Sequence, residues 1–357
     1  MHLIIGTYTE QLPHVNGKAD GILAASFDPA SGSIGPVTSL AAARNPSYLA
    51  TSASGERVYA VHETLTFEDQ PGGGVTAYAR DPRSGQLTWL NSRATHGESP
   101  CNVALDGTGR FVLIANYGEG AGSVTVYRVE PDGRLGDLTD HVKLAGGGPD
   151  PVRQATSHAH MITSDPVTGD ILATDLGSDA ILVYALDDEG RLTPKTPWSV
   201  NAAPGAGPRH LAFHPDGRHL FVVNELDSTV CALRREDDHW AVTSRVPTWP
   251  AEAGGQNLAG AIRVTPSGRH VLVSNRGHDS LAVLRFDPGA ATLSPVGFTP
   301  DAGECPRDFI VTPDARYVIA ASQNDDQLAS YEFDDESGAL RLLHSAVAPT
   351  PVCLVLA

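Results

Sequence analysis

Arginine, histidine and glutamate side chains recur at matching places along the sequence and together could act on an anionic substrate. Arg209, Arg276 and Arg307 could clamp a carboxylate or a phosphate by bidentate contacts. His160 could serve as a general acid or base near neutral pH. Glu225 could orient an arginine or activate water, or it could be a structural partner of Arg276. These residue types predict acid–base chemistry on an anion, provided that the fold brings them together.

The segment Ser157–His160 allows a second interpretation, as part of a metal site. His158 and His160 are two residues apart, so on a strand they would point to the same face. A catalytic metal needs a third ligand, which Asp175 or Glu225 could supply. The His, Asp and Glu residues show no further spacing typical of metal sites. We therefore expect no metal, and we place His158 beside the site as a substrate-binding or supporting residue.

These residues lie on a repeat that predicts the fold. A strand, an Asp/Pro/Gly turn and a second strand recur in seven copies, so one unit has 357/7 = 51 residues. A second hairpin, with Asp-Gly or Ser-Gly between apolar strands, alternates with the first. Two hairpins make a four-stranded sheet of the size of a propeller blade. The seven copies span residues 27–34, 80–87, 129–135, 186–192, 235–240, 286–289 and 333–338.

The two ends of the sequence complete one another. Seven outer hairpins accompany six complete inner hairpins, so the last inner hairpin must be shared. Pro351–Leu356 matches the first strand of such a hairpin, and Leu3–Thr7 matches the second. Pairing of these strands within one blade would close the ring and remove an open edge. We therefore predict an all-β, seven-bladed β-propeller that forms one domain over residues 1–357.

Equivalent positions in the blades should form rings around the central channel, because the innermost strands face it. The ring residues differ between blades and many are ionisable, which indicates a site built from several blades. The alternative is a polar channel without chemistry. We assign Tyr117, Asn275 and Gln323 to substrate binding, together with Arg307 and His158. The first ring comprises Ser47, Cys101, His160, Arg209, Gly260, Arg307 and Val352, and the second Glu63, Tyr117, Leu176, Glu225, Arg276, Gln323 and Thr7.

The composition excludes several classes of protein. Lys and Arg number 25 against 42 Asp and Glu, and the resulting charge of −17 would repel nucleic acids and anionic membranes. With 41% hydrophobic residues the chain is too apolar to be disordered, and 36 Gly and 26 Pro fit many turns in a packed protein. The four cysteines are widely spaced and the N-terminus has no signal-peptide pattern, so we expect reduced thiols and a cytoplasmic protein. The oligomeric state does not follow from these features.

Several stretches resemble the propeller-type lactonases, the cycloisomerase 2 and 6-phosphogluconolactonase-like family that is unrelated to the glucosamine-deaminase-like lactonases. The resemblance runs from Gly6–Thr9 to the C-terminal strand and covers nearly the whole chain. It implies a seven-bladed propeller, in agreement with the repeat. The stretches that carry it are Ser157–His160, Gly207–Pro215, Val223–Leu226, Ser274–Ser280, Cys305–Arg307 and Ala320–Gln323.

The resemblance implies a lactonase that acts on a small anionic sugar lactone without a metal or organic cofactor. The expected substrate is 6-phosphogluconolactone, hydrolysed to 6-phosphogluconate in the pentose phosphate pathway. The family also includes the fungal 3-carboxy-cis,cis-muconate lactonizing enzymes, whose proposed catalytic residues are matched by His160, Arg209, Arg276 and Glu225. The alternatives are a muconate-type cycloisomerase and a non-catalytic propeller scaffold. Ala261 stands where some members carry an acidic residue, which implies different substrate handling on that side.

Overall fold

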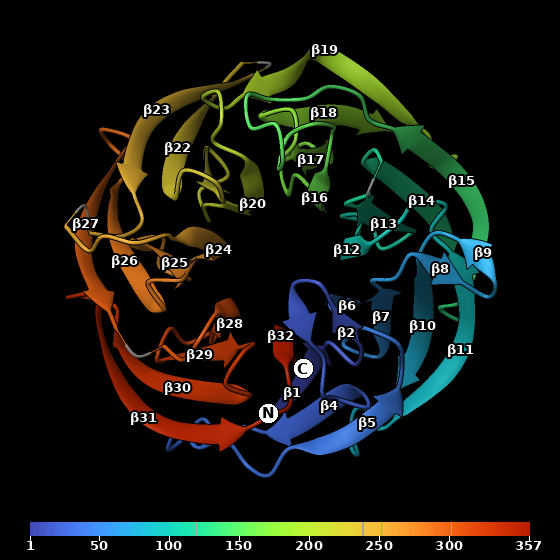
Figure 1. Ribbon diagram of the computed structural model, residues 1–357, viewed down its shortest axis with the longest axis horizontal. Coiled ribbons are helices and arrows are strands. Elements are labelled where there is room, and N and C mark those ends of the chain that lie inside the picture. Colours follow the sequence, from blue (N-terminus) through green and yellow to red (C-terminus); the bar gives the residue numbers. More distant parts are fainter. Residues whose placement is uncertain (119, 238, 251, 301) are drawn as a thin grey trace.

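Seven four-stranded antiparallel sheets surround a central axis, as the computed structural model shows (Figure 1). The structure describes residues 1–118, 120–237, 239–250, 252–300 and 302–357. Each sheet is one blade, which confirms the predicted all-β seven-bladed propeller. From the axis outward, blades 1 to 3 consist of β32 (Pro351–Leu356), β1 (His2–Thr7), β4 (Gly21–Ser26) and β5 (Thr38–Ala42); β6 (Leu49–Thr51), β7 (Arg57–His62), β10 (Gly74–Arg80) and β11 (Leu87–Ala94); and β12 (Pro100–Leu105), β13 (Phe111–Asn116), β14 (Ser123–Val129) and β15 (Leu135–Lys143). Blades 4 to 7 consist of β16 (Ala159–Ser164), β17 (Ile171–Asp175), β18 (Ala180–Leu186) and β19 (Leu192–Asn201); β20 (Pro208–Phe213), β21 (His219–Asn224), β22 (Thr229–Glu236) and β23 (His239–Pro247); β24 (Leu258–Val264), β25 (His270–Arg276), β26 (Ser280–Asp287) and β27 (Thr292–Thr299); and β28 (Pro306–Val311), β29 (Tyr317–Ser322), β30 (Gln327–Asp334) and β31 (Ala339–Val347).

Blade 1 contains both ends of the chain. The C-terminal strand β32 pairs antiparallel with β1, with Ile4 opposite Val355 and Ile5 opposite Leu354. On its other side β1 pairs with β4. The ring is therefore closed by main-chain hydrogen bonds between the first and last strands, as the sequence predicted.

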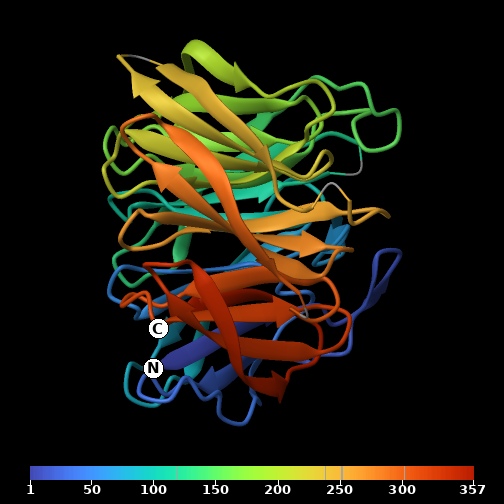
Figure 2. The ribbon, with the colours of Figure 1, turned by 90° about the vertical axis from the view of Figure 1, so that its left-hand side faces the viewer.

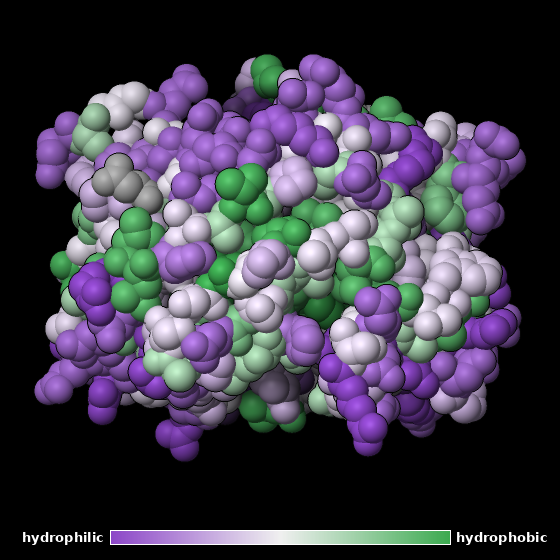
Figure 3. Space-filling view, turned by 90° about the horizontal axis from the view of Figure 1, so that it is seen from below, coloured by the Kyte–Doolittle hydropathy of each residue, from purple (hydrophilic) through white to green (hydrophobic). Residues whose placement is uncertain are grey.

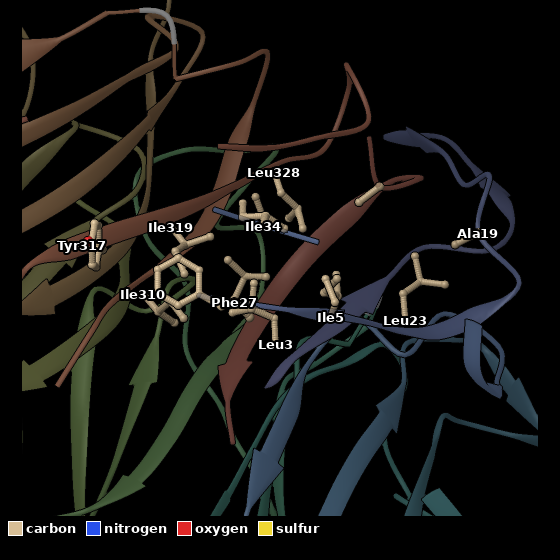
Figure 4. Packing of buried hydrophobic residues seen from close by; sticks show 14 residues of the cluster. Leu3, Ile5, Ala19, Leu23, Phe27, Ile34, Ile310, Tyr317, Ile319 and Leu328 are labelled. Carbon is tan, nitrogen blue, oxygen red and sulfur yellow. The ribbon is translucent and has the colours of Figure 1, made fainter. Parts of the chain in front are cut away.

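The hydrophobic core lies between neighbouring blades. Second strands such as β13 are buried along their whole length, because both faces of the sheet are covered by adjacent blades. Leu3 and Ile5 of β1 pack with Ile319 of the preceding blade, and the rings of Phe27 and Tyr317 meet edge-on with centroids 5.5 Å apart (Figure 4). The outermost strands alternate between half-buried and exposed positions, and apolar residues form a band around the outer edge while hydrophilic residues cover the two faces (Figure 3).

The two faces of the ring carry different connections. The termini lie at one face, and the short hairpin of β2 (Gln11–Leu12) and β3 (Val15–Asn16) projects from the other (Figure 2). A second short hairpin, β8 (Thr66–Phe67) and β9 (Gln70–Pro71), extends the connection between β7 and β10. The described part of the chain contains no helix that is long and apolar enough to cross a membrane.

The predicted inner turns lie at the face of the termini. Gly109, between β12 and β13, has a φ of 71°, a conformation that glycine adopts without steric cost. In the copy between β28 and β29, Ala315 takes the same conformation with a φ of 57°. The repeat therefore fixes the turn conformation even where glycine is replaced.

Candidate active site

A β-bulge at the start of the innermost strand sets the position of the first-ring residues. In β20, Pro208 pairs with Asn224 and His210 with Val223, so Arg209 is the extra residue. A bulge redirects a side chain and breaks the alternation of the strand. The same irregularity recurs at the positions that alignment of the turn glycines placed in the first ring. The residues that the strand register skips are Cys101, His160, Arg209, Gly260 with Ala261, Arg307 and Val352.

Glu225 follows β21 and binds three arginines. Its Oε2 accepts hydrogen bonds from Arg209 Nε at 3.0 Å and from Arg276 Nη2 at 2.7 Å. Its Oε1 accepts one from Arg153 Nη2 at 2.6 Å. Arg153 comes from residues 144–158, the connection between β15 and β16. The structure thus joins three predicted site residues and adds a fourth; we call Glu225, Arg153, Arg209 and Arg276 the Glu225 cluster.

The contacts within the Glu225 cluster determine its charge. Burial by itself would raise the pKa of Glu225, but Arg276, Arg209 and Arg153 hold this pKa well below its usual value. Burial, assisted by Arg276, lowers the pKa of Arg209 to about 10, so Arg209 stays protonated at neutral pH. A carboxylate with such a low pKa is a weak base. Glu225 therefore orients the arginines and does not take the proton.

His160 lies beside the Glu225 cluster and is 6% exposed. Burial and the neighbouring Arg209 lower its pKa well below the ordinary value for histidine. Its Nδ1 is 3.9 Å from Cys101 Sγ. Its ring meets the rings of Tyr117 and His210 edge-on, at centroid distances of 5.8 and 5.3 Å. At neutral pH the His160 imidazole is uncharged and can accept a proton.

Arg307 begins a hydrogen-bond chain on another side of the ring. Its Nη2 donates to the Tyr8 hydroxyl at 2.9 Å, and that hydroxyl donates to Glu63 Oε1 at 2.9 Å. Its Nη1 donates to Gln323 Oε1 at 3.3 Å. Burial raises the pKa of Tyr8 well above its ordinary value, so the hydroxyl stays protonated. Arg307 and Gln323 are therefore together, as the ring alignment predicts.

Tyr117 and His158 form a stacked pair next to the Glu225 cluster. Their ring centroids are 4.3 Å apart and the ring planes differ by 13°. His158 Nδ1 lies 3.1 Å from the carbonyl oxygens of both Tyr117 and Gly118, to which a protonated Nδ1 would donate. The Tyr117 hydroxyl is hydrogen-bonded to Arg153. The structure thus places Tyr117 against the cluster and His158 behind Tyr117 as its support.

The structure corrects the assignment of Asn275 to substrate binding. Its Oδ1 accepts from Thr248 Oγ1 at 2.7 Å and from Asn257 Nδ2 at 2.9 Å. Its Nδ2 donates to Thr248 O at 2.6 Å and to Ser280 Oγ at 3.2 Å. These four bonds use the full capacity of the amide. Neighbouring residues of a strand point to opposite faces, so Asn275 ties loops together while Arg276 faces the site.

Sequence reasoning missed three residues of this region and did not select a fourth. Arg153 lies outside the repeat, and its position four residues before Ser157–His160 is the signal that could have identified it. His210 lies next to Arg209 and its ring nitrogens are 3.2 and 3.3 Å from Arg209 Nη1. Tyr8 follows the first strand, and Glu63 belongs to the second ring.

Possible metal ligands are found at two places. Near the site, Asp175 accepts hydrogen bonds from the backbone of His158 and from Ser178, and so shapes a turn. At the opposite face, His214, Asp216 and His219 bring their ligand atoms within 4.8 Å of one another. There the histidine Nδ1 atoms lie 2.9 and 2.8 Å from the Asp216 oxygens, which are hydrogen-bond distances.

The most spacious cavity does not coincide with the charged centre. A cavity of about 630 Å³ lies between blades 2 and 3 and is lined by turn residues at the face of the termini, within residues 51–59, 105–110 and 129–133. Convergent buried groups with shifted pKa values indicate function better than volume does. We therefore place the candidate site at the Glu225 cluster and His160.

The site can stabilise a developing negative charge and move a proton. Arg209 and Arg276 offer guanidinium N–H groups whose positions are fixed by Glu225, and such fixed donors stabilise an oxyanion. The neutral His160 can take a proton from water. The arrangement therefore suits attack on a carbonyl group of an anionic molecule.

Comparison with known proteins agrees with this geometry. Residues 2–356 match the family described as "Lactonase, 7-bladed beta-propeller". A Bacillus subtilis protein named 6-phosphogluconolactonase is 35% identical over 98% of this chain and 96% of its own. The structure of a Pseudomonas aeruginosa periplasmic gluconolactonase superposes with a TM-score of 0.91 at 32% identity, covering 99% of this chain and 98% of its own. A Lactobacillus plantarum protein gives a TM-score of 0.88 at 33% identity, with coverage of 99% and 98%. This chain belongs to the seven-bladed β-propeller lactonase family.

Proposed function

We propose that the protein hydrolyses 6-phosphogluconolactone to 6-phosphogluconate. The observation that carries the proposal is the sharing of one carboxylate, Glu225, by three arginines beside the neutral His160. The family supplies the reaction class, a lactonase. The charges of the site supply the argument for a phosphorylated substrate.

The candidate site carries an excess of positive charge. Its four arginines, Arg153, Arg209, Arg276 and Arg307, face two glutamates, Glu225 and Glu63, so the formal balance is 4 − 2 = +2. A phosphate monoester carries about −1.5 to −2 at pH 7. The lactone of a phosphorylated sugar acid would therefore neutralise the site.

The proposed hydrolysis uses the residues as follows. Arg209 and Arg276 polarise the lactone carbonyl and stabilise the oxyanion of the tetrahedral intermediate. His160 removes a proton from the attacking water as its oxygen bonds to the carbonyl carbon. When the ring C–O bond breaks, protonated His160 returns the proton to the leaving alkoxide. The products are the free hydroxyl and the acid, whose carboxylate stays beside the arginines.

The named relatives support a lactone substrate and differ in its phosphorylation. The Bacillus subtilis protein is named for the phosphorylated lactone and the Pseudomonas aeruginosa protein for gluconolactone. The positive balance of the site favours the phosphorylated form. The unphosphorylated lactone is the comparison substrate in every assay below.

The direct test is the rate of acid release from freshly prepared 6-phosphogluconolactone in a pH-stat, corrected for spontaneous hydrolysis. We expect faster release with the protein, and the excess rate should disappear in Arg209→Gln. An unchanged rate with the wild-type protein would refute the proposal. Loss of the ultraviolet absorption of a conjugated muconate in a parallel sample would instead identify a cycloisomerase.

We also propose that the protein acts in the cytoplasm. Its four cysteines, Cys101, Cys231, Cys305 and Cys353, are free thiols, which suits a reducing compartment. The Pseudomonas aeruginosa relative is named periplasmic, so the question needs an experiment. Cell fractionation with an antibody against the protein should place it with cytoplasmic markers; recovery in a periplasmic fraction would refute this location.

A further inference from the structure

We propose that Arg153 and Tyr117 form a phosphate subsite at the solvent-facing side of the Glu225 cluster. The inference rests on the proposed function, because it assigns the phosphate of the substrate to particular residues. It extends that function by separating the residues that recognise the phosphate from those that act on the lactone carbonyl.

The surplus charge of the site belongs to the Glu225 cluster. There, three guanidinium groups share one carboxylate, a balance of 3 − 1 = +2. On the other side, Arg307 is matched by Glu63 through the Tyr8 hydroxyl that both contact. A dianionic group would therefore be drawn to the Glu225 cluster and not to Arg307.

Within the Glu225 cluster, Arg153 is the arginine that solvent reaches. The Arg153 side chain is 34% exposed, against 11% for Arg276 and 3% for Arg209. Arg209 also donates to Gly260 O at 3.0 Å and Arg276 to Ala259 O at 2.9 Å, which fixes both. Arg153 can turn toward a ligand while Glu225 keeps two arginine partners on Oε2.

The main chain beside Arg153 is held firmly. Gln154 is completely buried and donates to Leu176 O at 2.9 Å and to Asp179 Oδ1 at 2.8 Å. The Arg153 amide donates to Asp150 Oδ1 at 2.9 Å. The guanidinium therefore projects from a fixed backbone, which lowers the entropic cost of holding a ligand.

Tyr117 supplies a second donor at the same place. Its hydroxyl is hydrogen-bonded to Arg153, and its ring is fixed by stacking on His158. Guanidinium and hydroxyl groups side by side can both donate to the oxygens of one phosphoryl group. A phosphate at Arg153 and Tyr117 would leave Arg209, Arg276 and His160 for the lactone end of the substrate.

The experiment compares hydrolysis of 6-phosphogluconolactone and of δ-gluconolactone by the wild type and Arg153→Gln. Loss of one charged hydrogen-bonding partner should lower kcat/KM for the phosphorylated lactone about 10- to 100-fold, mainly through KM. For δ-gluconolactone kcat/KM should change less than about threefold, since the carbonyl machinery stays in place. Arg153→Lys should recover part of the loss because it restores the charge. Equal losses for both lactones, or no loss for either, would overturn the subsite.

Binding of the stable product separates this inference from the proposed function. In isothermal titration calorimetry, 6-phosphogluconate should bind Arg153→Gln at least about tenfold more weakly than the wild type. Arg134→Gln removes an exposed arginine that pairs with Asp132 on a distant turn, and should bind like the wild type. Absence of binding by the wild type would refute the proposed function and the subsite with it. Equal binding by the wild type and Arg153→Gln would refute the subsite alone.

Discussion

Two sets of buried ion pairs lie close to the propeller axis and differ in their balance of charge. In the Glu225 cluster one carboxylate holds three arginines, one of them a third exposed. On β24 and β28, Arg263 Nη2 donates to Asp308 Oδ1 at 2.6 Å, one charge against one. The second oxygen of Asp308 accepts the Leu354 amide at 2.9 Å, and Tyr48 is hydrogen-bonded to Arg263.

The difference separates a site from a structural link. The Arg263–Asp308 pair joins blades 6, 7 and 1 and leaves no net charge for a ligand to neutralise. The Glu225 cluster keeps a formal +2 and one arginine that solvent reaches. Buried charges cost free energy unless they are paired, so a buried surplus is expected where a ligand supplies the missing partner. The following predictions test this comparison.

The largest expected effect is the loss of activity in Arg209→Gln. Removal of one fixed donor to the oxyanion should lower kcat about 100- to 1,000-fold. Glu225 keeps Arg276 and Arg153, so the fold should persist. Steady-state hydrolysis and a thermal melt of the same sample measure both quantities. A variant that is folded and fully active would contradict the role given to Arg209.

Asp308→Asn should show the opposite pattern. Removal of one partner leaves the Arg263 charge uncompensated, and the free energy of unfolding should fall by about 3–5 kcal/mol. At a temperature where the variant is folded, its kcat should be within about twofold of the wild type, since Arg263 and Asp308 touch none of the Glu225 cluster residues through the hydrogen bonds described. Chemical denaturation and a low-temperature assay provide these values.

The double variant Arg263→Met with Asp308→Leu is the control for that pair. Apolar replacement of both partners should restore much of the stability that Asp308→Asn loses. If the double variant is also inactive while folded, the pair contributes to catalysis and the comparison fails.

A smaller effect is expected for Asn275→Ala. The variant leaves the partners of four hydrogen bonds unsatisfied, and the free energy of unfolding should fall by about 1–3 kcal/mol. KM for the lactone should not change, because Asn275 faces away from the site. A raised KM with unchanged stability would restore the substrate-binding role that the sequence suggested.

The smallest effect is expected between pH 8 and pH 6. The lowered pKa of His160 keeps its imidazole neutral in the folded protein throughout this range, so kcat should vary less than about twofold, as for a base that is already deprotonated. Activity should fall only as the pH decreases through the lowered pKa. A pH–rate profile with its acid limb centred near the ordinary histidine value would contradict the account.

Stability should follow a different pH course. Burial lowers the pKa of His62 to about 4, whereas in the unfolded chain it is about 6.5. Between these values the unfolded chain binds a proton that the folded protein does not, so the free energy of unfolding decreases as the pH falls from 6.5 to 4. Rate measurements therefore belong well below the melting temperature at each pH.

The repeat made the fold and the first ring predictable. Every blade has the same offset between the turn and the bulge, so alignment on the turn glycines placed Arg209, His160 and Arg307 at equivalent positions before any contact was known. The shared blade followed from counting hairpins. Local periodicity and turn chemistry carry this information because they are repeated in each blade.

The remaining parts of the site depend on departures from the repeat. Arg153 lies on a connection whose path is set by Gln154 and Asp179, far apart in sequence. His210 reaches the centre because the bulge at Arg209 breaks the alternation of the strand. Asn275 was misassigned for the converse reason, since regular alternation turns it away from Arg276. Ring positions could be inferred from the repeat, but side-chain pairing could not.

The most direct test of the central claim is a crystal structure of the wild-type protein with 6-phosphogluconate. We predict density for the sugar acid at the Glu225 cluster, with its carboxylate within hydrogen-bond distance of Arg209 and Arg276 and its phosphate at Arg153. Density for the product at another place, such as the cavity between blades 2 and 3, with Arg209 and Arg276 bound to Glu225 alone, would contradict the account.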